Sequence, residues 1–323
     1  MIAVPFGVSL VATLVSTMIL IRLCAGAGIV GRDVNKTGQP EVPEMGGLAI
    51  VAGFSAGILF TLGMITFLRL LPQVSMVMLL GVLSTVLLLS LIGVVDDLLG
   101  MHQGVKAFLP LLAALPLMAL RVGQSAVWIP FVGKVNFWIW YPLVLVPLGV
   151  TGAANAVNML AGFNGLEVGM GLVAMGSLAV IAGVLGQVTS LVLLLCGLGA
   201  LLGILRFNWY RARIFVGDVG TLTMGAIIAA ACIAGGLEVA GMILIVPYGV
   251  DFLFKAAHGF PSTGWHGELG EDGKLRCPVH GPVSLPQAML KITGGLHEPS
   301  LVLLLMGLEA VFGLLAIWLY LLR

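Results

Sequence analysis

The chain has 323 residues, of which 60% are hydrophobic and 9% are charged. Soluble domains carry about 25% charged residues, so this composition excludes an ordinary soluble protein and indicates an integral membrane protein. The net charge of +1 identifies no class of partner, and we expect no nucleic acid to bind. The four cysteines are scattered and indicate no disulfide framework.

Ten apolar runs follow one another along the chain. They cover residues 2–22, 47–68, 76–95, 107–120, 137–154, 168–186, 190–205, 221–236, 239–254 and 299–322. Because about 20 apolar residues cross the ~30 Å hydrocarbon core, we predict an all-α polytopic membrane protein with about ten transmembrane helices. Residues 1–323 then form one domain, with residues 259–298 as a loop between the ninth and tenth helices. Pro110 and Pro116 predict a kink in the short fourth run.

The charged residues favour one face of the membrane. Ten helices put both termini on one side, and eleven of the fifteen Lys and Arg residues then lie on the face of the odd-numbered loops. The positive-inside rule makes that face cytoplasmic. Twelve of the fourteen acidic residues lie there too, so we predict an active site at the cytoplasmic face. A transporter would place more polar groups near the midplane.

Asp96 and Asp97 stand together at the end of the third apolar run. Adjacent carboxylates disfavour each other at the edge of an apolar region unless a cation or polar ligand compensates them. The pair therefore predicts a functional site, with a solvated helix end as the alternative.

Two further stretches combine polar residues that suit ligand binding. Residues 155–167 hold three asparagines, two glycines and Glu167, which could recognise a base or a phosphate, or could form a helix C-cap and turn. Asp218, before the eighth run, fits either a metal ligand or a partner for the helix dipole. Phe215 could stack on a base or lie in an aromatic belt.

The metal expected at these carboxylates is Mg²⁺, with Mn²⁺ as a second choice. Both bind carboxylate oxygens together with substrate phosphates. A zinc site is the weaker alternative, because it depends on scattered residues: His258, His266, Cys277 and His280.

Four stretches, in order, resemble the polyprenyl-phosphate N-acetylhexosamine-1-phosphate transferases: residues 33–47, 93–106, 155–167 and 215–218. Residues 208–210, 277–280 and 296–298 are most similar to the eukaryotic and archaeal dolichyl-phosphate branch. The resemblance implies that N-acetylglucosamine-1-phosphate is transferred from UDP-N-acetylglucosamine to dolichyl phosphate, giving dolichyl-diphospho-N-acetylglucosamine and UMP with Mg²⁺. This reaction begins lipid-linked oligosaccharide synthesis for N-glycosylation.

The resemblance also implies roles for individual residues. The reaction centre is formed by Asp96, Asp97 and Lys106, and the metal ligands are Asn158 and Asp218. Substrate-binding residues are Lys36, Glu44, Gly162, Asn164, Glu167, Phe215, Arg276 and His280, with Gly162, Asn164 and Phe215 at the uridine.

Phosphoryl transfer to a lipid phosphate needs little help from a base. The second pKa of such a phosphate is ~6, so it is mostly dianionic at neutral pH, and positioning and charge neutralisation matter more. We therefore expect Asp97 to orient Lys106 or a water on the metal, and Asp96 to shape the acceptor-phosphate site.

The sequence departs from the family pattern in two places. His280 lies between Val279 and Gly281, where eukaryotic members have arginines that hold the diphosphate, and Arg276 is the nearest substitute. Gly100 and Gln103 replace a family Asn and Trp.

Several alternatives stay open from the sequence. One is a bacterial-type enzyme that uses undecaprenyl phosphate and another UDP-sugar. Another is a transporter or scaffold that keeps the site without the chemistry. Glycine-rich helices could pack against a second copy, so a homodimer is one expected assembly. The short loops slightly favour an archaeal plasma membrane over the endoplasmic reticulum.

Overall fold

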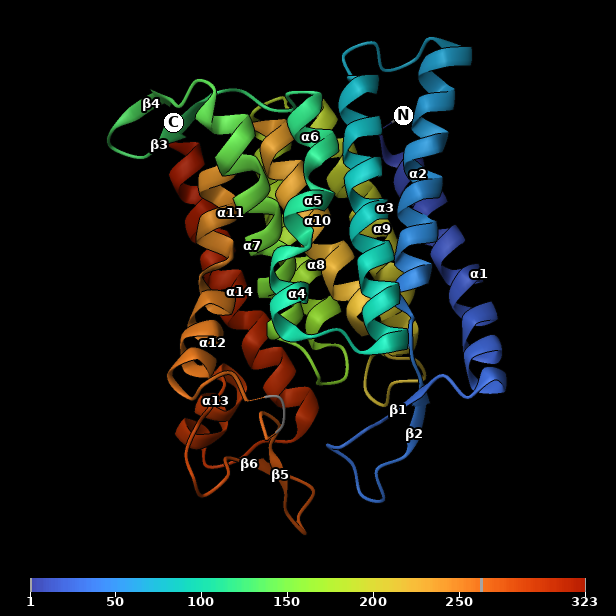
Figure 1. Cartoon of the computed structure of the whole chain (residues 1–323), viewed down its shortest axis with the longest axis vertical. Coiled ribbons are helices and arrows are strands. Elements are labelled where there is room, and N and C mark those ends of the chain that lie inside the picture. Colours follow the sequence, from blue (N-terminus) through green and yellow to red (C-terminus); the bar gives the residue numbers. More distant parts are fainter. Residues whose placement is uncertain (1, 262–263, 323) are drawn as a thin grey trace.

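Long apolar helices stand side by side in the computed structural model, which describes residues 2–261 and 264–322 (Figure 1). Eight of them are long and apolar enough to cross a membrane. They are α1 (Ala3–Ala27), α2 (Gly47–Leu68), α3 (Met76–Leu99), η1 with α7 (Tyr141–Leu145 and Val146–Met159), α8 (Leu166–Val184), α9 (Val188–Asn208), α10 (Gly217–Gly235) and α14 (Glu298–Leu321). This is the predicted all-α membrane bundle.

The other two predicted helices are interrupted. α11 (Glu238–Leu244) and α12 (Val246–Ala257) are bent by 52° at a break just before Pro247. The fourth run is divided into α4 (Gln103–Phe108), α5 (Pro110–Ala113) and α6 (Leu115–Ala119), because Pro110 and Pro116 cannot continue a helix. Length and composition thus give eight spans within the described residues, or nine with the bent pair, against the ten expected. The tenth run is the short segment 103–119, which still rises along the bundle from α4 to α6 (Figure 1).

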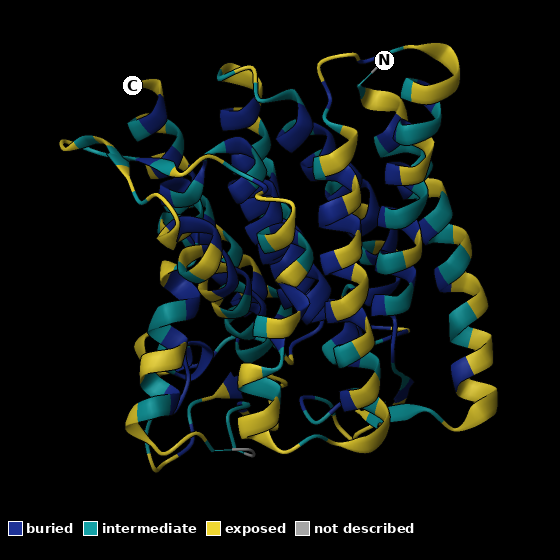
Figure 2. Ribbon diagram, turned by 45° about the horizontal axis from the view of Figure 1, so that its top comes forward, coloured by how far each residue is buried: buried dark blue, intermediate teal, exposed yellow. Residues whose placement is uncertain are grey.

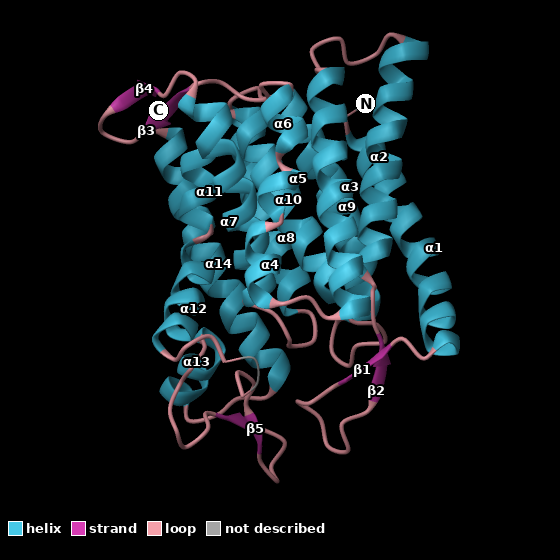
Figure 3. Cartoon of the chain, viewed as in Figure 1, coloured by secondary structure: helices cyan, strands magenta, loops and turns pink. Residues whose placement is uncertain are grey.

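The two ends of the bundle differ. α1 begins and α14 ends at one end, which also carries the hairpin of β3 (Ala126–Ile129) and β4 (Gly133–Asn136) (Figure 1). We call this the terminal end. The opposite, looped end carries the hairpins β1–β2 and β5–β6 (Figure 3). Their strands are Val30–Arg32, Glu41–Pro43, Glu268–Leu269 and Leu275–Arg276. Strands of two to four residues are too short to show alternation, so the sequence did not predict them.

α10 is the centre of the bundle. Of its membrane-crossing window, 83% is buried, against 22% for α1 at the edge (Figure 2). Its neighbours approach closely through glycine: a Cβ on Gly47 of α2 or Gly93 of α3 would overlap the backbone of α10. A Cβ on Gly225 of α10 would lie 2.5 Å from the Cα of Ala154 on α7. Such close packing of small residues fixes the height of α10 relative to α3 and α7.

The predicted loop between α12 and α14 has its own structure. Outside residues 262–263, which lie beyond the described residues, it holds the β5–β6 hairpin and α13 (Leu285–Thr293). The Ser284 side chain caps α13 by accepting a hydrogen bond from the Gln287 backbone N–H at 3.3 Å. Leu275 and Leu296 exchange two backbone hydrogen bonds, which tie the hairpin to the start of α14. The segment covers part of the looped end (Figure 1).

Candidate active site

Four side chains from four helices form a polar cluster at the looped end. Lys106 Nζ of α4 lies 2.6 Å from Asp96 Oδ2 of α3 and 2.5 Å from Asp218 Oδ2 of α10. Asn158 of α7 donates to Asp218 Oδ1 at 2.6 Å. We call these four residues the mouth cluster. The structure thus brings together residues that the sequence places up to 122 positions apart.

Asp97 lies beside the mouth cluster but has a different task. Its carboxylate accepts the backbone N–H groups of Asp218 at 2.7 Å and of Val219 at 3.1 Å. These are free donors in the first turn of α10, so Asp97 caps that helix and complements its dipole. We expected Asp97 to orient Lys106, and that expectation is wrong, because Asp96 holds the lysine. Asp97 instead fixes the backbone that carries Asp218.

Glu44 adds negative charge next to the mouth cluster. It follows β2, and burial followed by repulsion from Asp218 raises the pKa of its carboxyl above the ordinary value. The Glu44 carboxyl also occupies the space that a Cβ on Gly31 would need, so the β1–β2 hairpin presses it inward. Glu44, Asp96, Asp97 and Asp218 therefore share one nearby lysine.

This excess of carboxylate suits a divalent cation. Mg²⁺ commonly binds through one or two protein carboxylates and completes its ligands with substrate phosphates and water. Asp218 is the accessible carboxylate, with 32% of its side chain exposed against 5% for Asp96. Within the described residues no group of three or more His, Cys, Asp or Glu side chains could hold a metal without substrate. Cys277 and His280, the zinc alternative, belong to no such group.

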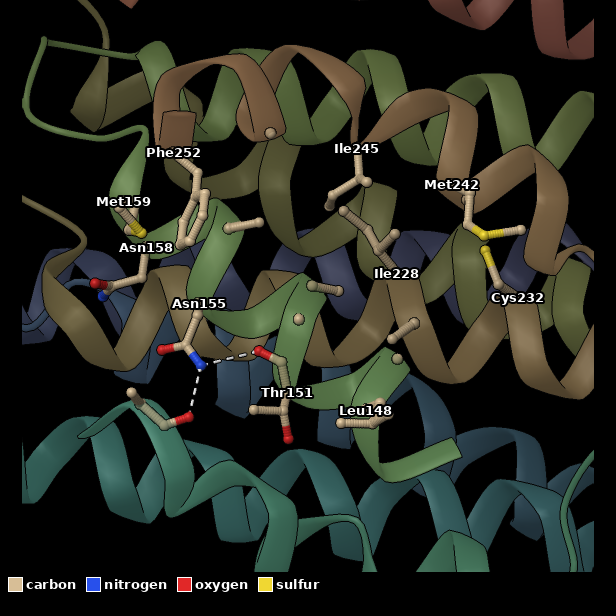
Figure 4. Close-up of a pocket in the computed structure, with 18 of the residues that line it drawn as sticks. Leu148, Thr151, Asn155, Asn158, Met159, Ile228, Cys232, Met242, Ile245 and Phe252 are labelled. Carbon is tan, nitrogen blue, oxygen red and sulfur yellow. Dashed lines mark hydrogen bonds between the residues drawn. The ribbon is translucent and has the colours of Figure 1, made fainter. Parts of the chain in front are cut away.

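A groove of about 1300 Å³ begins at the mouth cluster. Lys106, Asn158 and Asp218 line one end, and the terminal-end hairpin lines the other through Val127 and Ile129. The walls between them come from α7, α10, α11 and α12 and are mostly apolar. In Figure 4, Asn158, Met159 and Phe252 lie near one end, and Cys232 and Met242 lie near the other.

The groove is open to the side of the bundle. Leu148 on α7 and Met242 on α11 line it, yet they are 56% and 58% exposed. Asn155 links the walls near the mouth: its amide donates to the carbonyls of Ala107 and Thr151, both at 3.0 Å (Figure 4). Roughly 25 Å of helix, at ~1.5 Å per residue, separates Asn158 from Tyr141. The groove therefore runs along most of a ~30 Å hydrocarbon layer.

A second polar cluster is closed. Lys36 pairs with Glu298 at the start of α14 and lies 3.2 Å from Asp33 Oδ2. Asn164 donates its amide to Asp33 Oδ2 at 3.1 Å and its backbone N–H to Glu298 Oε1 at 2.7 Å. We call Asp33, Lys36, Asn164 and Glu298 the loop cluster. It joins the β1–β2 loop, the α7–α8 loop and α14.

Asn164 also accepts a hydrogen bond from the Ala212 backbone N–H at 2.7 Å, so both ends of its amide bond the protein. The loop cluster therefore holds three loops in fixed positions. A direct contact of Lys36 or Asn164 with substrate stays a prediction.

Gly162 and Glu167 shape the α7–α8 loop. Glu167 is buried, and its carboxylate accepts the Gly162 backbone N–H at 2.7 Å. Gly162 has a φ of +103° and is solvent-exposed, and the ring of Trp265 covers the position where a Cβ would stand. Glu167 thus supports the loop from within, whereas the Gly162 backbone faces outward toward Trp265.

The remaining predicted residues lie around these clusters. Phe215 braces two loops, because its backbone N–H donates to Pro43 O and its carbonyl accepts from the Gly46 N–H, both at 2.8 Å. Arg276 makes a two-point pair with Asp272 on the exposed β5–β6 hairpin, at 2.6 and 3.0 Å. His280 is exposed and bonds to no other described residue. The structure therefore does not bring Arg276 and His280 into the mouth cluster.

Two polar pairs were missed by the sequence analysis. Lys255 lies 2.8 Å from Asp251 on α12, and Tyr141 donates to Glu238 at the terminal end of the groove. An acidic and a basic residue four positions apart inside an apolar run are a helix-surface pair, and this signal was present in the sequence. The Tyr141–Glu238 contact joins residues 97 positions apart and leaves no local signal.

Comparison with known proteins agrees with this geometry. The family model described as Glycosyl transferase family 4 matches residues 79–236, which contain the mouth cluster. A Saccharolobus solfataricus protein is 37% identical over 98% of this chain and 96% of its own. It carries a provisional name, UDP-N-acetylglucosamine–dolichyl-phosphate N-acetylglucosaminephosphotransferase. The chain belongs to the polyprenyl-phosphate N-acetylhexosamine-1-phosphate transferases. The resemblance seen in the sequence is confirmed.

More distant relatives extend the family in two directions. A Dictyostelium discoideum protein named UDP-N-acetylglucosamine–dolichyl-phosphate N-acetylglucosaminephosphotransferase is 24% identical over 80% of this chain and 69% of its own. A Bacillus subtilis protein named as a probable undecaprenyl-phosphate N-acetylglucosaminyl 1-phosphate transferase is 31% identical over 69% of this chain and 60% of its own. Family membership makes this chain a phosphotransferase enzyme in a membrane setting, which answers the transporter and scaffold alternatives.

Proposed function

We propose that this protein transfers N-acetylglucosamine-1-phosphate from UDP-N-acetylglucosamine to dolichyl phosphate, releasing UMP. The observation that carries the proposal is the mouth cluster at the end of a laterally open apolar groove. A polyprenyl phosphate has a charged head and a long apolar chain, and this groove matches both parts. The names of the relatives support the same substrates.

The mouth cluster would neutralise and position phosphate. Lys106 is already fixed by two carboxylates, so it can meet an incoming phosphate without a large loss of side-chain freedom. We assign Asp218 and Asn158 to the metal site. Mg²⁺, when bound, supplies further charge neutralisation at the diphosphate. Asp97 keeps Asp218 in place through the first turn of α10.

The reaction needs no strong base. An oxygen of the lipid phosphate attacks the β-phosphorus of the nucleotide sugar, the bond from that phosphorus to the bridging oxygen breaks, and UMP leaves with that oxygen. The attacking phosphate is mostly dianionic at neutral pH, because its second pKa is ~6. Asp96 would therefore hold Lys106 at the acceptor phosphate rather than remove a proton.

We place the nucleotide sugar on the loop side of the mouth cluster. Glu44, Gly162, Phe215 and the loop cluster border this region, and their backbone bonds hold the surrounding loops together. Their contacts with uridine and sugar belong to the proposal, as do those of Arg276 and His280. The latter two would have to move with their exposed segments to reach a diphosphate.

The setting of the enzyme is also proposed. The distribution of Lys and Arg supports a cytoplasmic looped end. The archaeal relative is more similar than the Dictyostelium one, which supports an archaeal plasma membrane over the endoplasmic reticulum. A single ten-segment domain that could form a homodimer fits the exposed apolar face of α1.

Release of UMP from UDP-N-acetylglucosamine by the purified protein tests the proposal. UMP should form only when both dolichyl phosphate and Mg²⁺ are present, with Mn²⁺ as a substitute. The bacterial relative makes undecaprenyl phosphate the competing acceptor, so both lipids should be compared with a panel of UDP-sugars. No UMP from any pair would refute a transferase of this kind, and a preference for undecaprenyl phosphate would refute the dolichyl assignment.

A further inference from the structure

The groove mouth has a second lysine that the mouth cluster does not use. Lys106 and Lys255 are the Lys and Arg residues of the described groove lining, and they come from α4 and α12. The Lys255 side chain is only 10% exposed to solvent. Its neighbours in the lining at this end of the groove include Met159, Phe252 and Trp265.

The hydrogen-bond donors of Lys255 can be counted. An ammonium has three N–H donors. One faces Asp251 Oδ2 at 2.8 Å, and a second donates to the carbonyl of Met159, the last residue of α7. The third has no partner among the described residues, although the lysine lies in the wall of a cavity. A buried ammonium with a spare donor can bind an anion that enters this cavity.

A purely structural role accounts for only part of this arrangement. Lys255 caps the C-terminal end of α7, where a cation is favourable, and Asp251 also accepts the Leu285 backbone N–H of α13 at 2.8 Å. That role needs two donors and no cavity. It leaves unexplained why the cation faces the groove next to Asn158.

The charges at the mouth also favour a second cation. Asp96 and Asp218 together more than balance Lys106, whereas Lys255 faces one carboxylate and one neutral carbonyl. A dianionic phosphate at the end of the apolar groove would therefore find little net positive charge from Lys106 alone. Val279 and Gly281 on either side of His280 supply none.

We propose that Lys255 is a second cationic contact for the phosphate of the prenyl-phosphate acceptor. This inference rests on the proposed function, because it takes the groove to hold the lipid chain. The phosphate would accept from the third N–H of Lys255, while Asp251 and Met159 hold the ammonium in place. Lys255 would then contribute to binding of the lipid and leave the nucleotide sugar unaffected.

The test compares binding of farnesyl phosphate with binding of farnesol. The main variant is Asp251→Asn with Lys255→Gln, because removing both charges leaves no unpaired buried carboxylate and Gln can still donate to Met159. Affinity for farnesyl phosphate, measured by calorimetry in detergent without nucleotide, should fall about tenfold or more. Affinity for farnesol and for UDP-N-acetylglucosamine should stay unchanged. Lys255→Arg should retain most of the binding of farnesyl phosphate.

Lys291→Gln is the matched control, because Lys291 is an exposed lysine on α13 outside the groove. Thermal melting of each variant separates loss of folding from loss of binding. The inference is overturned if the double variant binds farnesyl phosphate normally, or if farnesol and farnesyl phosphate weaken equally. It is also overturned if UDP-N-acetylglucosamine, or inorganic phosphate alone, shows the loss instead. Because these are binding measurements, their outcome is separate from whether the unmodified protein releases UMP.

Discussion

The mouth cluster and the loop cluster contain the same chemical parts. Each has one lysine between two carboxylates, and each has an asparagine that donates to one of them. They differ in surroundings. In the loop cluster the three charged side chains are at most 11% exposed, whereas Lys106 and Asp218 are 20% and 32% exposed and line the groove.

This difference explains how similar parts can serve different ends. In the loop cluster, backbone N–H groups and the buried amide of Asn164 complete the partners of the charges, so little capacity is left for a ligand. In the mouth cluster, carboxylates outnumber the lysine and open onto a cavity. A closed ionic network stabilises the protein, and an open one with excess charge can bind metal and phosphate. The predictions below test this distinction.

The largest effect is expected from Asp218→Ala. It removes the accessible carboxylate of the mouth cluster, and turnover should fall by about a hundredfold to a thousandfold, as for loss of a group that stabilises transition-state charge. Rates of UMP release with saturating Mg²⁺ measure it. Asp272→Ala, at an exposed ion pair on the β5–β6 hairpin, is the control and should keep normal turnover. Near-normal turnover of the Asp218 variant would place the chemistry elsewhere.

Glu298→Ala should act on stability instead. It leaves the buried Lys36 ammonium with one carboxylate and takes the partner from the Asn164 backbone N–H, at a cost of about 3 kcal/mol. The melting temperature in detergent should fall clearly, and Glu298→Gln should recover part of the loss. Turnover per folded molecule should change by only a few-fold. If turnover is lost while the melting temperature is unchanged, the loop cluster is part of the reaction centre.

Asp97 should link the two kinds of effect. Asp97→Ala leaves two N–H groups of α10 without their acceptor, which costs about 1 kcal/mol, and it frees the backbone that positions Asp218. We expect both a lower melting temperature and about tenfold lower turnover. Asp97→Asn keeps a capping oxygen and should have smaller effects on both. A variant that loses turnover equally with Ala and Asn would point to a need for charge at this position.

The far end of the groove should affect the lipid chain only. Phe137 follows β4 and lines the groove, whereas its neighbour Asn136 does not. Phe137→Ala should raise KM for a long polyprenyl phosphate by a few-fold while leaving that for farnesyl phosphate unchanged, because the shorter chain does not reach the hairpin. Asn136→Ala is the matched control. Equal changes for both lipids would show that the chain does not extend to the terminal end.

The smallest effect concerns pH and Glu44. Burial and Asp218 raise the pKa of Glu44, so folding favours its protonated form. Its contribution to stability is therefore present below the ordinary value of ~4.3 and is lost as pH rises through the raised pKa. Glu44→Gln should be more stable than the unmodified protein at neutral pH, and the difference should vanish in acid. Melting curves across pH measure this, and a constant difference would show that Glu44 does not titrate in this range.

Much of the fold was readable from the sequence because apolar composition and span length are local properties. The runs at 47–68 and 299–322 became α2 and α14 with nearly the expected bounds. The fourth run differed, since Pro110 and Pro116 divided it more finely than a single kink. α13 and the three hairpins escaped prediction because they are short and are held by contacts such as Leu275 with Leu296.

By itself, the sequence determined that this is a helical membrane protein of a phosphotransferase family and that Asp96, Asp97, Lys106, Asn158 and Asp218 belong to its reaction centre. Only the tertiary structure decided how they divide the work. Asp96 rather than Asp97 meets Lys106, and Lys255 reaches the groove, because α3, α7, α10 and α12 converge at the looped end. Residue type and spacing report what chemistry is available. Which oxygen faces which cation depends on the packing of helices that are distant in sequence.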